Sequence, residues 1–301
     1  MSLTDKQNLR TPLHRIDRHP VLSRWGLPSM MIAPFLIVAA VFMIAPTIML
    51  AVQAVSGTDG FTLKYIAALS GETFRLAAYN SLVLSLASAT VGVAFGGAIT
   101  AVVIHRRSPP VLGAIASSFS AVAANFAGVP LAFAFISSLG MFGVLTRLLK
   151  AAGIDIYAAG FTLYSLTGLT IVYAYFQIPL MITIIMPAFR ALRLEWAEAA
   201  ESLGATPRQY ARLVMLPILA PSIVSAFILL FGSAFSGYAT AYALTSGNLV
   251  LLTTEIGNVL SGDVMSSPQT GAALSVAMIV IMAAVVLASS LLMRRARRWQ
   301  A

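Results

Sequence analysis

The sequence predicts an all-α integral membrane protein with six transmembrane helices. Apolar residues make up 59% of the 301 residues and charged residues only 10%, less than half the charged share of a typical soluble domain. The charged residues leave six long intervals free of Asp, Glu, Lys and Arg, each longer than the ~20 residues that cross a bilayer core. A water-soluble fold would have too few charges to cover so much apolar surface.

Each charge-free interval is expected to hold one helix. Backbone amides in lipid must bond within their own segment, and the alternating pattern of a membrane β-strand is absent. The expected helices cover about 30–55, 80–104, 111–139, 162–186, 214–240 and 271–293. The stretch 241–270 between the last two is expected to be an external re-entrant or amphipathic segment, with a seventh short helix as the alternative.

The basic residues predict the orientation of these helices, because Lys and Arg are enriched in cytoplasmic loops. With the N-terminus in the cytoplasm, most of the 19 basic residues fall in cytoplasmic segments. Only Lys64, Arg75, Arg147 and Lys150 fall on the external side. We therefore expect both termini in the cytoplasm, a tail over 1–24 and a transmembrane domain over 25–301. The net charge of +9 then reflects membrane topology, and no nucleic-acid partner is expected.

The sequence lacks the residues that several other functions require. No ionisable residue lies at membrane depth in the predicted helices, which argues against an ion-coupled carrier, although backbone carbonyls alone can hold sodium. There is no cysteine and no phosphate-binding G-x-x-x-x-G-K-[ST] loop, and H-E-x-x-H and G-x-S-x-G are also absent. No catalytic residue, cofactor or metal site is predicted. If ATP drives transport, another polypeptide binds it.

The segment between the fourth and fifth predicted helices carries the most specific pattern. Residues 195–203, directly before Gly204, are expected to form a short amphipathic helix of good helix formers. Gly204 can end this helix in a left-handed conformation. Thr206 can cap a second helix that has Pro207 at its first position. The segment therefore predicts a cytoplasmic helix–turn–helix, and Pro217 is expected to begin the next membrane helix. Glutamates recur every three residues at 195, 198 and 201, which indicates a solvated or partner-facing surface rather than a metal or acid–base site.

This segment resembles the EAA loop of bacterial ABC importer permeases, whose pattern is E-A-A-x3-G-x9-I-x-L-P. The matching residues are Glu198, Ala199, Ala200, Gly204, Leu216 and Pro217, with Val214 in place of isoleucine. The resemblance implies a type I importer permease fold over about 75–293, in the bacterial inner membrane. It also implies that these residues couple the chain to a cytoplasmic ATPase dimer. Further implied partners are a second permease subunit, an extracytoplasmic substrate-binding protein and membrane lipid.

Stretches such as Val129–Phe133 and Phe235–Leu244 resemble the permeases for polyamines, 2-aminoethylphosphonate and ferric iron. The resemblance implies a small polar substrate of this group. Polar side chains within the predicted helices either line the translocation pathway or bond neighbouring helices together. They are Asn80, Asn125, Gln177, Ser233, Ser236, Tyr238 and Tyr242. A secondary carrier or channel is the alternative function, and a membrane-embedded enzyme is a third class without polar catalytic groups at membrane depth.

Overall fold

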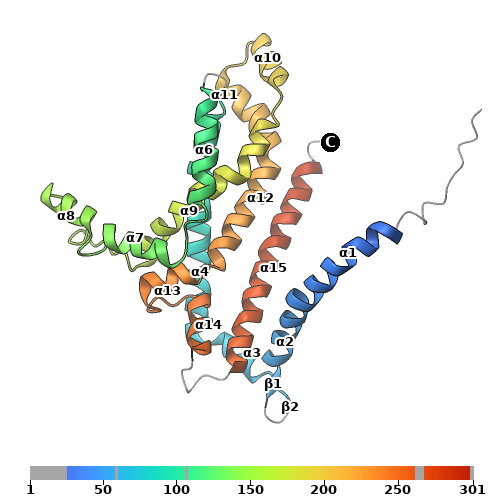
Figure 1. The fold of residues 1–301 in the computed structure, drawn as a ribbon, viewed down its shortest axis with the longest axis vertical. Coiled ribbons are helices and arrows are strands. Elements are labelled where there is room, and N and C mark those ends of the chain that lie inside the picture. Colours follow the sequence, from blue (N-terminus) through green and yellow to red (C-terminus); the bar gives the residue numbers. More distant parts are fainter. Residues whose placement is uncertain (1–25, 58–59, 106–107, 262–267, 299–301) are drawn as a thin grey trace, which may run out of the picture. The chain divides into compact units, whose positions relative to one another are not determined.

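The computed structural model describes residues 26–57, 60–105, 108–261 and 268–298 (Figure 1). Six segments in this part of the chain are long and apolar enough to cross a bilayer. They cover Pro34–Ala54, Glu72–Val103, Val129–Ala151, Leu166–Arg190, Pro207–Phe235 and Pro268–Leu291. The predicted all-helical membrane fold is therefore confirmed, with six candidate spans by length and composition. The predicted tail over 1–24 lies outside the described residues.

The chain divides into two units, Met1–Met49 and Leu50–Ala301. The first unit contains most of the first span. This span is formed by α1 (Gly26–Ala39), the π-helical turn η2 (Ala40–Ile44) and α2 (Ala45–Ala54), which follow one another without a break. Apolar residues dominate its sequence all round the helix, as expected for a segment whose solvent is lipid.

Three helices form the centre of the second unit: α4 (Glu72–Val91), α9 (Leu166–Arg190) and α12 (Leu216–Phe235). They pack pairwise against one another. The helix of α4 continues through a π-helical turn, η4 (Gly92–Gly96), into α5 (Gly97–Val103). A Cβ at Gly96 would lie 2.7 Å from the Ile178 carbonyl oxygen. Glycine is therefore needed where this helix approaches the backbone of α9 most closely.

The expected continuous third helix over 111–139 is wrong. The chain forms α6 (Pro110–Ala123), a break, α7 (Val129–Leu139), a second bend and α8 (Val144–Ala151). At the break, Gly128 has a left-handed φ of 77°, and its N–H donates to Thr240 Oγ1 at 2.8 Å. A partner 112 residues away thus stabilises a bend that the uniformly apolar local sequence does not reveal.

The fourth helix lies about one turn later than the predicted 162–186. Ser165 caps α9, because its side chain accepts a hydrogen bond from the Gly168 N–H at 3.2 Å. At the other end α9 runs on to Arg190, a cation in the last turn that suits the negative end of the helix dipole.

The fifth helix is longer on one side and shorter on the other than the predicted 214–240. The helix α11 (Pro207–Tyr210), the π-helical turn η5 (Ala211–Met215) and α12 form one continuous run. Pro217 therefore lies inside this run and does not begin a separate helix. The run ends at Phe235, and two short helices follow, α13 (Ala239–Thr245) and α14 (Leu252–Leu260). They occupy the described part of the stretch predicted as re-entrant or amphipathic.

Most of the remaining elements of the second unit precede α4 or follow α14. The strands β1 (Ser56–Gly57) and β2 (Gly60–Phe61) pair in antiparallel register, and α3 (Lys64–Ala67) with the 3₁₀ turn η3 (Ala68–Ser70) leads into α4. The last helix, α15 (Pro268–Arg298), packs against α12 and α14. In Figure 1, α11 and α10 (Leu194–Ser202) lie at one end of this unit and α14 lies at the other.

Candidate functional site

The segment that matches the EAA pattern forms a helical hairpin with a defined turn. After α10, Gly204 adopts a left-handed φ of 75°. Its N–H donates to the Glu201 carbonyl at 2.9 Å, and the Ala205 N–H donates to the Ala200 carbonyl at 2.9 Å. These two bonds are the pair that defines a Schellman motif, in which glycine follows the last helical residue. The local geometry expected of Gly204 is therefore present.

The second helix of the hairpin begins with a capping box, as the sequence predicts. Thr206 Oγ1 accepts a hydrogen bond from the Gln209 N–H at 3.3 Å, and Gln209 Oε1 accepts one from the Thr206 N–H at 2.7 Å. Pro207 occupies the first helical position, where its missing N–H leaves no hydrogen bond unmade. The turn is thus fixed on both sides by backbone hydrogen bonds.

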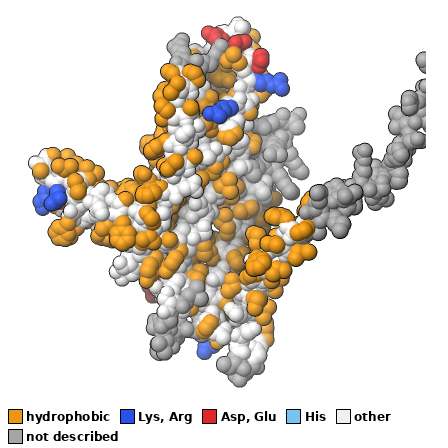
Figure 2. All heavy atoms as spheres, in the orientation of Figure 1, with side chains coloured by type: hydrophobic (Ala, Val, Ile, Leu, Met, Phe, Trp, Pro, Cys, Tyr) orange, Lys and Arg blue, Asp and Glu red, His pale blue; other side chains and the backbone are white. Residues whose placement is uncertain are grey.

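The hairpin, defined here as residues 194–217, presents a mixed acidic and apolar surface. Ala199 is exposed and Ala200 half-buried, so both small residues are near the surface of α10 beside Glu198. Leu194 and Trp196 are exposed, and Leu203 at the tip is 88% exposed. Figure 2 shows acidic side chains gathered at the α10 end. The side chains of Leu194, Trp196 and Leu203 leave apolar surface exposed outside the candidate spans.

Leu203 and Trp196 were not among the residues predicted from the sequence. The Arg193 guanidinium lies 5.8 Å from the centre of the Trp196 ring, a distance typical of a cation–π contact. In the sequence, Leu203 is marked only by its place directly before Gly204. Leucine at this place belongs to no functional motif, so only the exposed fraction of its side chain identifies Leu203.

The hairpin continues into the membrane run without interruption. At the π-helical turn, the Leu216 N–H donates to the Ala211 carbonyl five residues earlier. Pro217 follows, and with Leu213, Val214 and Ile218 it lines a shallow hollow of about 330 Å³. Leu216 and Pro217 therefore join the hairpin to α12 and do not separate the two.

Two of the predicted pathway residues are engaged in holding the fold together. Gln177 is fully buried, and its Nε2 donates to the Leu230 carbonyl at 3.0 Å and to Ser88 Oγ at 3.4 Å. It thereby ties α9 to α12 and α4. Asn80 Nδ2 donates to the Val250 carbonyl at 3.0 Å. The sequence left two roles open for both residues, lining the pathway or bonding neighbouring helices, and these hydrogen bonds correspond to the second role.

Two other predicted pathway residues share one groove. Ser233 and Ser236, together with Gly232 and Ser275, line a mainly apolar groove of about 630 Å³ formed by α12, α14 and α15. Ser236 is exposed and its Oγ donates to the Gly232 carbonyl at 2.9 Å. The groove brings these two serines together on one face of the second unit.

Of the last three predicted residues, two lie at helix breaks and the third, Tyr242, lies in α13. Asn125 is exposed at the α6–α7 break, where its Nδ2 donates back to the Ala121 carbonyl at 2.7 Å. Tyr238 lies between α12 and α13 and stacks on Tyr242, with the ring centres 5.2 Å apart. Among the described residues, no cluster of His, Asp and Glu has the size needed to hold a metal ion.

The two helix breaks are joined to neighbouring elements by part-buried hydrogen bonds. Tyr173 on α9 is fully buried, and its hydroxyl donates to the Gly237 carbonyl at 2.8 Å. A Cβ at Gly237 would lie 2.8 Å from that hydroxyl oxygen. Because Thr240 on α13 bonds to Gly128, the α12–α13 break and the α6–α7 break are held by one set of contacts. Discontinuous helices of this kind line binding sites in several transporters.

Comparison with known sequences gives short or distant matches to one group of proteins. No family model matches the chain. It is 38% identical over 79 residues to the trehalose transport system permease protein SugB of Mycobacterium tuberculosis, which covers 26% of this chain and 29% of SugB. The chain therefore spans less than a third of the length of this relative. It is 23% identical over 244 residues to the spermidine/putrescine transport system permease protein PotC of Escherichia coli, covering 78% of this chain and 81% of PotC.

Comparison with solved structures extends the likeness over nearly the whole chain. A crystal structure of a bacterial ABC transporter involved in the import of the acidic polysaccharide alginate contains a chain with the same fold. The TM-score is 0.72 at 18% sequence identity, and the match covers 91% of this chain and 97% of that one. At this identity the likeness concerns the fold, which agrees with the fold class predicted from the sequence.

Proposed function

We propose that this chain, which belongs to the family of binding-protein-dependent ABC importer permeases, forms a translocation pathway together with a second permease subunit. It is a transport subunit and not an enzyme. The hairpin geometry is the observation that carries the proposal. A Schellman turn at Gly204, a capping box at Thr206 and an unbroken helix into the bilayer make a rigid docking element of Glu198, Ala199, Ala200, Gly204, Leu216 and Pro217. Its partner is a cytoplasmic ATPase dimer, whose closure moves the hairpin.

The remaining partners and the orientation belong to the same proposal. An extracytoplasmic binding protein delivers the substrate on the membrane face opposite the hairpin. Both termini lie on the hairpin side in the bacterial inner membrane, with 1–24 as a cytoplasmic tail and 25–301 as the permease domain. Arg190 and Arg193 directly before the hairpin, and Arg208 and Arg212 within it, support this orientation, because Lys and Arg are enriched in cytoplasmic segments.

The substrate is proposed to be a small polar solute, with polyamines, 2-aminoethylphosphonate and ferric iron as candidates. The extent of the match to the spermidine/putrescine permease supports the first of these. The groove lined by Ser233 and Ser236 is the proposed pathway surface, with Tyr238 and Asn125 at the adjoining breaks. Gln177 and Asn80 are proposed to fix the helices around it.

Unique cysteines test the docking role, because the chain has no cysteine of its own. Ala200→Cys places one in the hairpin, and Ala159→Cys, also near the surface, is the matched control on the opposite face. In intact cells a membrane-impermeant maleimide should label position 159 and not 200. After purification, a photo-crosslinker on position 200 should capture a protein with a nucleotide-binding site, and position 159 should not.

Two results would contradict the proposal. One is labelling of position 200 from outside the cell. The other is substrate accumulation by this polypeptide alone on an ion gradient, which would favour the alternative of a secondary carrier or channel.

A further inference from the structure

The segment 140–161 forms an arm that follows α7, and its surface is apolar on one side and basic on the other. On α8, Val144, Leu145 and Leu148 are exposed. Arg147 and Lys150 lie on the adjoining face of the same short helix, because residues three apart are neighbours on a helix surface. Figure 2 shows apolar and basic side chains together on this arm. Such a distribution is typical of a helix that lies in the plane of a membrane interface.

The arm begins within the apolar segment Val129–Ala151, which qualifies as a candidate span by its length and composition. Its helix α8 is separate from α7 and is too short to cross a bilayer by itself. α8 has eight residues, or about 12 Å of helix, against a hydrocarbon core of about 30 Å. The backbone at Gly140 and Gly143 is extended, with ψ values of 171° and 154°, which separates α8 from α7. The arm directly precedes α9, whose 25 residues span about 37 Å. Because the hairpin follows the other end of α9, the arm and the hairpin lie on opposite membrane faces.

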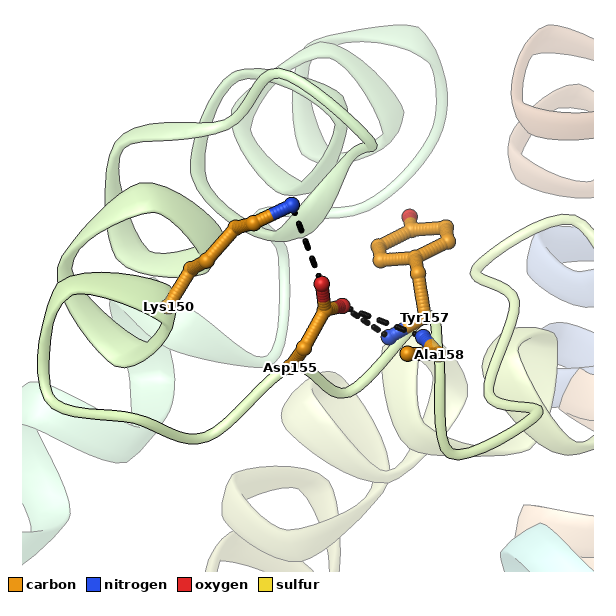
Figure 3. Close-up of polar contacts among 4 residues, drawn as sticks. All are labelled: Lys150, Asp155, Tyr157 and Ala158. Carbon is orange, nitrogen blue, oxygen red and sulfur yellow. Dashed lines mark hydrogen bonds and ion pairs between the residues drawn. The ribbon is translucent and has the colours of Figure 1, made fainter.

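Internal contacts hold the arm in one conformation (Figure 3). Lys150 Nζ lies 3.0 Å from Asp155 Oδ2. The other carboxylate oxygen of Asp155 accepts the N–H groups of Tyr157 and Ala158 at 3.2 and 3.0 Å. The Tyr157 hydroxyl donates to the Leu139 carbonyl at 2.9 Å, so the far part of the arm is fastened to the end of α7. These contacts join α8 to the following turn and the following turn to α7.

The charges of the arm identify what covers this face. Asp155 neutralises Lys150, and no described carboxylate forms an ion pair with Arg147. Phe142, in the bend before α8, is 86% exposed, and Leu148, which follows Arg147 in the chain, is 62% exposed. A surface with an apolar half and one net positive charge is complementary to the boundary between acyl chains and anionic headgroups.

We propose that the arm binds anionic phospholipid on the face opposite the hairpin, with Leu148 and its apolar neighbours at the acyl boundary and Arg147 on a headgroup phosphate. Arg147 thereby makes the seating of the arm depend on lipid charge. The proposal does not rest on the coupling role of the hairpin, and its test requires neither transport nor ATP hydrolysis.

Lipid-borne quenchers test the proposal on the full chain. The variants Leu148→Cys and Leu203→Cys each carry one fluorophore and are reconstituted in vesicles of phosphatidylcholine and phosphatidylglycerol. Both leucines are exposed, so Leu203 in the hairpin is the matched control. Bromine on the acyl chains should quench the probe at 148 several-fold more than the probe at 203, and aqueous iodide should show the opposite order.

The role of Arg147 is tested by moving the bromine between the two lipids. The probe at 148 should be quenched about fivefold more by the phosphatidylglycerol form than by an equal share of the phosphatidylcholine form, the size of effect expected for one cation near the surface. Arg147→Gln should remove this preference and Arg147→Lys should retain it.

Three outcomes overturn the proposal. In the first, iodide quenches the probe at 148 as strongly as the probe at 203. In the second, Arg147→Gln leaves the lipid preference unchanged. In the third outcome neither quencher reaches the probe at 148, which would mean that a protein covers it. Quenching of position 203 by lipid would instead contradict the aqueous location of the hairpin, and so distinguishes failure of the proposed function.

Discussion

Gly204→Ala isolates the contribution of one backbone conformation to the hairpin. The φ of Gly204 is +75°, and no atom lies within 4 Å of the position that a Cβ would occupy. The added methyl group therefore meets no steric contact with a neighbour, and the cost is the left-handed conformation itself, about 1–2 kcal/mol for a residue with a Cβ. At the lower end this reduces the population of the native turn relative to open forms about fivefold.

Hydrogen–deuterium exchange on the purified chain measures this effect directly. The amide groups of residues 204 and 205 are held by the carbonyl groups of Glu201 and Ala200. In the Gly204→Ala variant these two amides should exchange about fivefold faster, with exchange in α12 unchanged. The matched control is Gly204→Asn, since asparagine adopts left-handed conformations more readily than alanine, and it should exchange close to the wild-type rate.

The same two variants separate local geometry from coupling. In the complex with its ATPase, Gly204→Ala should lower transport-coupled ATP hydrolysis while insertion into the membrane stays normal, and Gly204→Asn should retain most of it. Equal behaviour of the two variants in both assays would refute the reasoning, because the left-handed conformation would then not determine the shape of the docking element.

Three further predictions concern the packing of the second unit and the arm. Gly96→Ala should lower the free energy of unfolding by about 1–3 kcal/mol through overpacking, since the added Cβ would lie 2.7 Å from a backbone oxygen of α9. Gly97→Ala is the control and should be neutral, because its Cβ would lie 3.9 Å from the nearest atom. Thermal unfolding of both variants checks this, and equal unfolding midpoints would contradict it. Tyr173→Phe leaves the Gly237 carbonyl without its hydroxyl donor and should lower the unfolding midpoint by about 2–4 °C; an unchanged midpoint would show that the bond contributes nothing net. The Ala158 N–H donates to the Asp155 carboxylate, and Lys150 lies close to it, so the pKa of Asp155 is lowered below its ordinary 3.8. The ionised carboxylate should therefore stabilise the arm above pH 3.8, and the arm should lose its protection from proteolysis as the pH falls through the lowered pKa. Asp155→Asn should remove this pH dependence.

The sequence was sufficient for the number of spans because the charged residues that separate them are few. It was insufficient for the break between α6 and α7. The interval around Gly128 is uniformly apolar, and the bond that fixes its conformation comes from Thr240, far away in the chain. Hydrophobic periodicity and charge patterns do not reveal such a tertiary contact. The prediction therefore extended one helix across the break at Gly128.

The hairpin was predictable to a greater degree, because glycine, threonine and proline act through local backbone geometry. Gly204 and Thr206 adopt the conformations expected of them. Pro217 was misread as the start of a helix, since a proline inside a helix normally interrupts it. Here the wider π-helical turn directly before it lets the helix continue. The exposure of Leu203 was invisible in the sequence, because exposure depends on what the rest of the fold leaves uncovered.

The continuous run from Pro207 to Phe235 has a mechanical consequence. Its 29 residues make a rod of about 43 Å, with the docking surface at one end and the groove serines at the other. A tilt of about 5° at the hairpin end would displace the far end of such a rod by about 4 Å. A separate helix beginning at Pro217 would have absorbed such a tilt at its joint. Under the proposed coupling role, this unbroken run would carry a rotation of the hairpin directly to the groove lined by Ser233 and Ser236.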